Sequence, residues 1–236
     1  MKVSIIIPAY NEEENIEKTI RSLMEQTYED YEIIVVNNNS KDRTQEIAEK
    51  LVRTVNEEKQ GYMHAVQRGI DETDGELVTI CDADSIYSKN WLQRMVKPFE
   101  KDPETVATYG IGAFADSSSF SKFFSTIFYT LFLWFSKLCG LDNTAGFNFV
   151  YKREAYIKSG GYDTSWTLGG PDVEFGNRLK KYGKVKLVHT VVGTSSRRFK
   201  KNGFFKTLRM FAHIWWSLVR HKKPKISYEE YNKTRK

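Results

Sequence analysis

The feature that most constrains this chain is a short apolar run that ends in two carboxylates. Residues 77–84 read Leu-Val-Thr-Ile-Cys-Asp-Ala-Asp. A run of this length, rich in branched side chains, predicts a buried strand. Open α/β sheets bind their ligands beyond the carboxyl ends of the strands, where Asp82 and Asp84 would lie. The run therefore predicts a sheet and the edge of that sheet at which a site would form.

The spacing of the two acids suits a cation. Residues two apart on an extended strand point to the same face, so both carboxylates can reach one ion. Carboxylate oxygens are hard ligands that suit Mg²⁺ or Mn²⁺. The same spacing is common in solvated turns and helix caps, so the pair alone leaves both interpretations open.

Strand and helix patterns alternate along the chain. Apolar strand runs and helical spacings predict, in order, a strand over 3–7, a helix over 15–26, a strand over 32–36, a helix after residue 40, the strand over 77–80, a helix after residue 88 and a last strand over 184–192. Continuous apolar strands separated by helices predict a parallel sheet covered on both faces. Functional loops are expected at 8–14, 37–42 and 82–85, where the strands end.

The order of these motifs resembles the family 2 glycosyltransferases, which have the GT-A fold and transfer a sugar from a nucleotide sugar with inversion at the anomeric carbon. The likeness starts with Ile-Ile-Ile-Pro-Ala-Tyr-Asn-Glu at residues 5–12 and extends to about residue 200. It implies a Rossmann-like α/β fold with a mostly parallel, helix-covered sheet. It also implies a catalytic domain over 1–200, in which residues 1–110 bind the nucleotide and residues 140–200 bind the acceptor.

The resemblance further implies roles for individual residues. Glu12 would lie near the ribose hydroxyls, and Arg197 and Arg198 would close over the donor diphosphate, although a solvated loop is the alternative there. The implied substrate-binding residues are Pro8, Ala9, Tyr10, Glu12, Asn37, Asn38, Gly61, Asp82, Ala83, Gly170, Arg197 and Arg198. The implied ligands of Mg²⁺ or Mn²⁺ are Asp82, Asp84 and His189, unless His189 simply sits in the last strand.

Asp172 is the expected catalytic residue. The sequence Pro171-Asp172 stands where the family has Glu-Asp at the start of a helix, and the Asp of that pair is the general base. Because Pro followed by Asp is favourable at a helix start, a purely capping role for Asp172 is the alternative. A glycine pair at 169–170 precedes it and would allow close backbone approach to a sugar.

One loop departs from the family pattern. Asn37-Asn38-Asn39-Ser40 stands where the family commonly has Asp-Asp-Gly-Ser, with an Asp that accepts a hydrogen bond from the base. An Asn carbonyl also accepts, but without the charge that strengthens the bond. The base of the donor nucleotide is therefore left open.

Two segments are expected to form amphipathic helices outside this domain organisation. Residues 118–140 place an apolar stripe (Phe120, Phe123, Phe124, Ile127, Phe128, Leu131, Phe132, Phe135 and Leu138) opposite polar side chains. Their uncharged stretch is too short to cross a bilayer, so the stripe covers the sheet, forms a homodimer face or lies against lipid. Residues 201–236 form a basic amphipathic helix and tail, with Trp and cations that suit a membrane interface or packing on the sheet.

Charge and cysteine content bear on partners and location. The net charge is +6, but residues 197–236 hold 13 Lys and Arg against two Glu, which leaves a negative balance for the rest. Such a segment can face substrate phosphates or an anionic membrane surface, and no nucleic-acid partner is expected. Two cysteines and no signal peptide predict a cytoplasmic protein without disulfides, with peripheral contact to the cytoplasmic membrane face as an option.

Together these features predict a metal-dependent, inverting hexosyltransferase that moves a sugar from a nucleotide-diphosphate sugar to a hydroxyl of a glycan or lipid-linked acceptor. Three alternatives stay open. Transfer to a polyprenyl phosphate needs no base, because that acceptor is already ionised. A nucleotidyltransferase normally has a Gly-rich basic loop after its first strand, which residues 8–13 do not provide. The third alternative is a non-catalytic nucleotide-sugar-binding protein.

Overall fold

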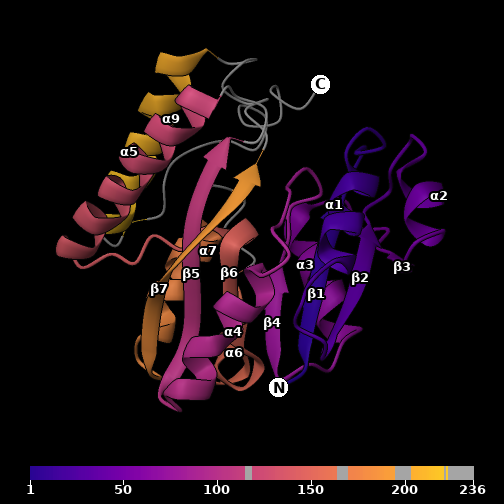
Figure 1. Cartoon of the computed structure of the whole chain (residues 1–236), viewed down its shortest axis with the longest axis horizontal. Helices are drawn as coiled ribbons and strands as arrows, with labels where there is room; N and C mark the ends of the chain where they lie inside the picture. Colours follow the sequence, from indigo (N-terminus) through magenta and orange to yellow (C-terminus); the bar gives the residue numbers. More distant parts are fainter. Residues whose placement is uncertain (115–118, 164–169, 195–202, 221, 223–236) are drawn as a thin grey trace.

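A seven-stranded, mostly parallel sheet forms the centre of the computed structural model, which describes residues 1–114, 119–163, 170–194, 203–220 and 222 (Figure 1). The strand order is β3-β2-β1-β4-β6-β5-β7. The strands are β1 (Val3–Ala9), β2 (Tyr31–Asn37), β3 (Arg53–Asn56), β4 (Leu77–Ile80), β5 (Thr105–Phe114), β6 (Phe149–Lys152) and β7 (Lys184–Thr194). Only β6 runs antiparallel to its neighbours among these strands of the described chain. The expected sheet is confirmed.

Helices cover both faces of the sheet, because its strands carry apolar side chains on both sides. Ile5 and Ile7 of β1 belong to one buried cluster and Ile6 to the other. The first cluster is covered by α1 (Ile16–Met24), α2 (Thr44–Glu49) and α4 (Trp91–Lys101). The second is covered by α3 (Tyr62–Asp71), α5 (Ser119–Leu138), α6 (Arg153–Lys158) and α7 (Pro171–Leu179). A last helix, α9 (Phe204–Val219), lies beside α5 (Figure 1).

The reversed direction of β6 brings distant parts of the chain to one sheet edge. Because β6 is antiparallel to β4, its amino end lies where the parallel strands have their carboxyl ends. The short 3-10 turn η1 (Gly146–Asn148) leads into β6 at that edge, next to the loop that follows β4. The hydroxyl of Thr79 on β4 donates to the carbonyl of Phe149 on β6 at 2.9 Å and fixes this pairing.

A buried amide holds the same edge together. Asn148 is fully buried, and its Oδ1 accepts from Nε1 of Trp91 on α4 at 2.9 Å. Its Nδ2 donates to the carbonyls of Ile111 on β5, at 3.0 Å, and Thr190 on β7, at 3.3 Å. One side chain therefore ties a helix to two strands, and nothing in the sequence pattern had pointed to it.

Helix α5 turns much of its apolar stripe to solvent. Phe128, Leu131 and Leu138 are exposed, whereas Leu133 and Ser136 are fully buried. Packing of the whole stripe against the sheet, one of the expected alternatives, is therefore wrong. No helix among the described segments combines the length and apolarity that crossing a membrane requires.

Candidate active site

The two acids that follow β4 lie at the carboxyl edge of the sheet and share a side. Asp82 and Asp84 are partly exposed and alternate with the buried Cys81 and Ala83. The hydroxyl of Thr19 on α1 donates to the carbonyl of Ala83 at 2.9 Å and holds the turn in place. Two hard carboxylates on one side fit a divalent cation that takes its other ligands from water or substrate.

Asp172 reaches the same edge from α7. This helix begins at Pro171, as expected, and the Thr144 hydroxyl donates to the Asp172 carbonyl at 2.6 Å. The carboxylate lies against η1, since a Cβ added at Gly146 would be only 2.7 Å from its Oδ2. A side chain at position 146 would therefore displace the carboxylate.

Electrostatics show that Asp172 and Asp82 occupy one neighbourhood. Burial, followed by the negative charge of Asp82, raises the pKa of Asp172 to about 7, and the backbone N–H of Gly146 and the hydroxyl of Tyr162 oppose this rise. Because the interaction between charges falls with distance, Asp82 lies close enough to Asp172 for its charge to act on that carboxyl. A cation held by Asp82 would reverse the second cause and lower this pKa.

Aromatic packing fixes the helix that carries Asp172. Phe175 of α7 is fully buried, and its ring centroid lies 4.4 Å from that of Tyr162 and 5.0 Å from that of Tyr151. Burial of the two tyrosines is the main cause that raises the pKa of each hydroxyl, and the negative charge of Asp172 adds to the rise in both. Sequence reasoning missed this aromatic packing around α7. Its only signal in the sequence was the presence of aromatic residues near the glycine pair at 160–161.

A buried acid also anchors α7 and had not been expected from the sequence. Asp142 is almost fully buried and accepts from the hydroxyl of Tyr109 at 2.8 Å. It pairs with Lys180 at 2.7 Å and Lys137 at 3.4 Å, while its backbone exchanges hydrogen bonds with the Asn177 amide. The end of α5, strand β5 and helix α7 are therefore joined beside the site.

The side chains of the two asparagines at the end of β2 form hydrogen bonds within the protein. Both are buried: Nδ2 of Asn37 donates to Gln45 and Asn56, at 3.0 and 2.9 Å, and Nδ2 of Asn38 donates to the carbonyls of residues 57 and 59. Oδ1 of Asn38 accepts from the N–H of Gly61 at 2.7 Å. Their donors hold two loops together, and a contact of the Asn37 or Asn38 side chain with the donor base stays a prediction.

The residues at the end of β1 and in the loop after it differ in how far they are exposed. Pro8 and Tyr10 are partly exposed at the edge, whereas Ala9 is buried within the end of β1. The side chain of Glu12 is also buried, and its carboxylate accepts from Asn15 at 3.0 Å at the start of α1. The position of Glu12 near the ribose hydroxyls stays a prediction.

The structure bears in different ways on the remaining predicted site residues. Gly170 has φ +86°, and a Cβ there would first meet Leu218 of α9 at 3.0 Å; the approach of a sugar to the Gly170 backbone stays a prediction. His189 is exposed on β7, and no three His, Cys, Asp or Glu side chains within the described ranges are arranged to hold a metal, so nothing here supports it as a ligand. Arg197 and Arg198 lie outside the described residues.

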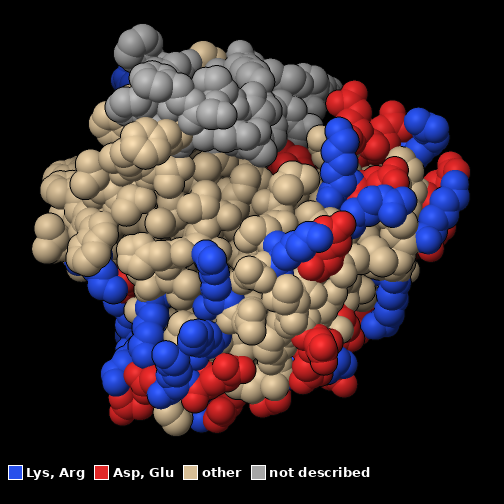
Figure 2. Space-filling view, in the orientation of Figure 1, with Lys and Arg blue, Asp and Glu red and all other residues tan. Residues whose placement is uncertain are grey.

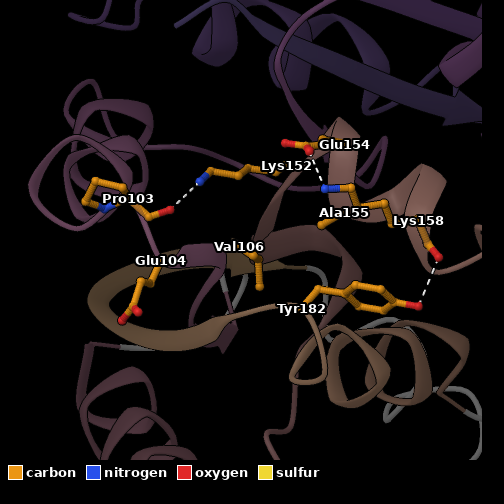
Figure 3. Close-up of a pocket in the computed structure, with 8 residues that line it drawn as sticks. All are labelled: Pro103, Glu104, Val106, Lys152, Glu154, Ala155, Lys158 and Tyr182. Carbon is orange, nitrogen blue, oxygen red and sulfur yellow. Dashed lines mark hydrogen bonds and ion pairs between the residues drawn. The ribbon is translucent and has the colours of Figure 1, made fainter.

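A separate hollow of about 190 Å³ lies at the opposite edge of the sheet, near the start of β5 and the end of β6 (Figure 3). Its polar side chains are engaged with one another and with nearby backbone: Lys152 donates to the carbonyl of Pro103, Lys158 pairs with Glu154, and the Tyr182 hydroxyl donates to the Lys158 carbonyl. It is not lined by Asp82, Asp84 or Asp172 and forms no part of their site.

Comparison with known proteins defines the class of the fold. A mannosyltransferase from Pyrobaculum calidifontis, solved with GDP-Man and Mn²⁺, superposes with a TM-score of 0.67 at 20% identity, covering 92% of this chain and 68% of that one. Glucosyl-3-phosphoglycerate synthase from Mycobacterium tuberculosis, solved with Mn²⁺, UDP and glucosyl-3-phosphoglycerate, gives a TM-score of 0.61 at 20% identity, covering 96% and 81%. The fold is GT-A.

The family follows from the sequence match. Residues 4–160 match the glycosyl transferase family 2, and the chain belongs to that family. A glucosyl-dolichyl phosphate glucuronosyltransferase of Haloferax volcanii is 29% identical over 178 residues, which cover 70% of this chain and 57% of the relative. The chain thus spans little more than half the length of this relative. The family assignment favours a glycosyltransferase over the nucleotidyltransferase that the sequence had left open.

Proposed function

We propose that this chain transfers a sugar from a nucleoside-diphosphate sugar to an acceptor hydroxyl, with inversion at the anomeric carbon. The observation that carries the proposal is the closeness of Asp82 to Asp172, which come from the two halves of the chain. The GDP-Man and UDP bound in structures of the same fold support a nucleotide donor.

In this proposal Asp82 and Asp84 hold Mg²⁺ or Mn²⁺. The bound cation offsets the negative charge of the departing nucleoside diphosphate. Pro8, Ala9, Tyr10 and Gly61 line the nucleotide side mainly through backbone. Arg197 and Arg198, in the proposal, add positive charge near the diphosphate.

Asp172 is the proposed general base. Its carboxylate removes the proton of the acceptor hydroxyl as that oxygen attacks the anomeric carbon from the face opposite the nucleotide. A base works best when its pKa lies near the working pH, and the pKa of Asp172 is raised to about 7. The absence of a side chain at Gly146 leaves room for the carboxylate, because an added Cβ would lie 2.7 Å from its Oδ2.

The test combines donor binding with turnover. Thermal shifts with UDP, GDP and dTDP sugars, with and without Mn²⁺, should reveal the donor, because a ligand that binds only the folded state raises the melting temperature. Asp84→Ala should abolish the Mn²⁺-dependent shift. Asp172→Asn should keep the shift and lower turnover by about 10²- to 10⁴-fold. Glu174→Gln, two residues along α7, is the matched control and should retain turnover.

Three outcomes would redirect the proposal. If Asp172→Asn turns over like the wild type with an acceptor hydroxyl, Asp172 is not the base. If that variant is active only with a polyprenyl phosphate, the acceptor is a phosphate that needs no base. Absence of hydrolysis and transfer with every nucleotide sugar that binds would instead indicate a non-catalytic binding protein.

A further inference from the structure

We propose that the exposed side of α5, together with the adjoining side of α9, binds the surface of an anionic lipid bilayer. The two helices lie side by side at the left of the molecule, next to the carboxyl-terminal part of β5 (Figure 1). The inference concerns a surface and does not depend on the proposed reaction.

The outer side of α5 is unusually apolar for a side that faces water. Six of its large side chains are 53–84% exposed: Phe123, Phe128, Leu131, Trp134, Phe135 and Leu138. Figure 2 shows an area without charged side chains on the left of the molecule, over this helix, while acids and cations alternate across much of the remaining surface. Large continuous apolar areas of this kind mark interaction sites, whereas single exposed apolar residues need no explanation.

The inner side of α5 fixes this orientation. Leu133 and Ser136 are buried, and the Ser136 hydroxyl accepts from Nε1 of Trp215 on α9 at 2.8 Å. The rings of Phe135 and Trp215 stack with centroids 5.6 Å apart. These contacts hold the buried side of α5 in place and leave its outer side in solvent.

The charges around this surface favour lipid over a second copy of the chain. Segments 119–139 and 203–222 contain no Asp or Glu. On α9 the exposed cations Lys206, Arg209 and Arg220 follow one helical row, which also contains the half-exposed Trp216. Arg220 also lies over the ring of Trp216, 5.9 Å from its centroid.

A face with only positive charge repels an identical face and attracts anionic headgroups. Aromatic side chains beside cations are typical of helices that lie in the membrane interface. Helix α9 also packs on α7, because Ile214 and Leu218 form a buried cluster with Val173, next to Asp172. The bilayer surface would therefore lie close to the candidate base, a consequence that does rest on the proposed function.

Flotation of the full chain with lipid vesicles tests the proposal without donor or acceptor. The chain should float with vesicles of phosphatidylcholine and phosphatidylglycerol and remain behind with phosphatidylcholine alone. Leu131→Glu combined with Phe128→Glu should abolish flotation. Ile157→Glu is the matched control, because Ile157 is 67% exposed on α6, away from this surface, and it should float like the wild type. Circular dichroism should show all these variants folded, since each change replaces a side chain already in water.

The cations provide an independent second test. Arg209→Gln and Arg220→Gln should each weaken partition onto the anionic vesicles roughly fivefold. Equal flotation of the wild type and the Leu131→Glu, Phe128→Glu variant would overturn the proposal. So would a wild type that ignores vesicles and forms a dimer that Leu131→Glu dissociates, because the surface would then belong to a second copy.

Discussion

Replacing Asp172 by Asn should stabilise the folded protein at neutral and higher pH while it removes the proposed base. The pKa of Asp172 rises from 3.8 to about 7, first because of burial and then because of the charge of Asp82. At about 1.4 kcal/mol per pKa unit, ionising this group in the folded state costs about 4 kcal/mol at most. Because Asp172 is partly exposed, solvent screening should reduce the observed gain to about 2 kcal/mol.

The sign of the pH dependence follows from proton binding. Between pH 3.8 and about 7 the folded state keeps a proton that the unfolded state has released, so the free energy of unfolding falls as pH rises through this window. Below the window the acid is protonated in both states, and above it the penalty is constant. The advantage of Asp172→Asn over the wild type should therefore grow from about pH 4 to about pH 7 and then level off.

Urea unfolding of the metal-free protein across this range measures the effect. Asp102→Asn is a control of opposite sign, because Lys186 above all, and then Lys184, holds the pKa of Asp102 down to about 2. That substitution should destabilise the protein at neutral pH, and its effect should fade as the pH falls toward 2. An advantage of Asp172→Asn that is the same at every pH would refute the electrostatic account of the site.

Three other substitutions test the structure around the acids. Gly146→Ala should leave the protein folded but lower turnover at least tenfold, measured in a transfer assay, because the new Cβ would lie 2.7 Å from the Asp172 carboxylate. Asn148→Ala should lower the free energy of unfolding by about 2–4 kcal/mol in urea titrations, because it leaves Trp91 Nε1 and two carbonyls without partners. Asp142→Asn should cost about 1–3 kcal/mol in the same titrations, because two lysines and a tyrosine hydroxyl lose a buried charge.

The sequence predicted the sheet because its strands are marked by continuous apolar runs. It did not predict β3 or β5. Strand β5 contains Gly110 and Gly112, which normally argue against a strand interior. The structure gives the reason for both: a Cβ at Gly110 would lie 2.3 Å from Asn148, and one at Gly112 would lie 2.7 Å from Phe147. Such a requirement comes from a residue far along the chain and is invisible in a local pattern.

The same limit applies to the site. Asp82 was selected from a local signal, the end of a strand, whereas Asp172 was selected from the family resemblance, with a helix start as its only local signal. The hydrogen bonds that hold Asn37 and Glu12 inside the protein were not predicted, because their burial depends on the neighbouring loop. The orientation of α5 depends on Trp215, about eighty residues later, and could not be deduced from the stripe itself.

The antiparallel course of β6 has a consequence for how such a chain can diversify. The chain leaves the sheet after Phe114 on β5 and returns at Phe149 on β6, and the two strands remain paired whatever lies between them. An excursion at this point can lengthen, shorten or change its surface chemistry without altering the register of β1, β2 and β4. Surface changes can therefore accumulate between β5 and β6 over evolution while the pairing of the sheet stays the same.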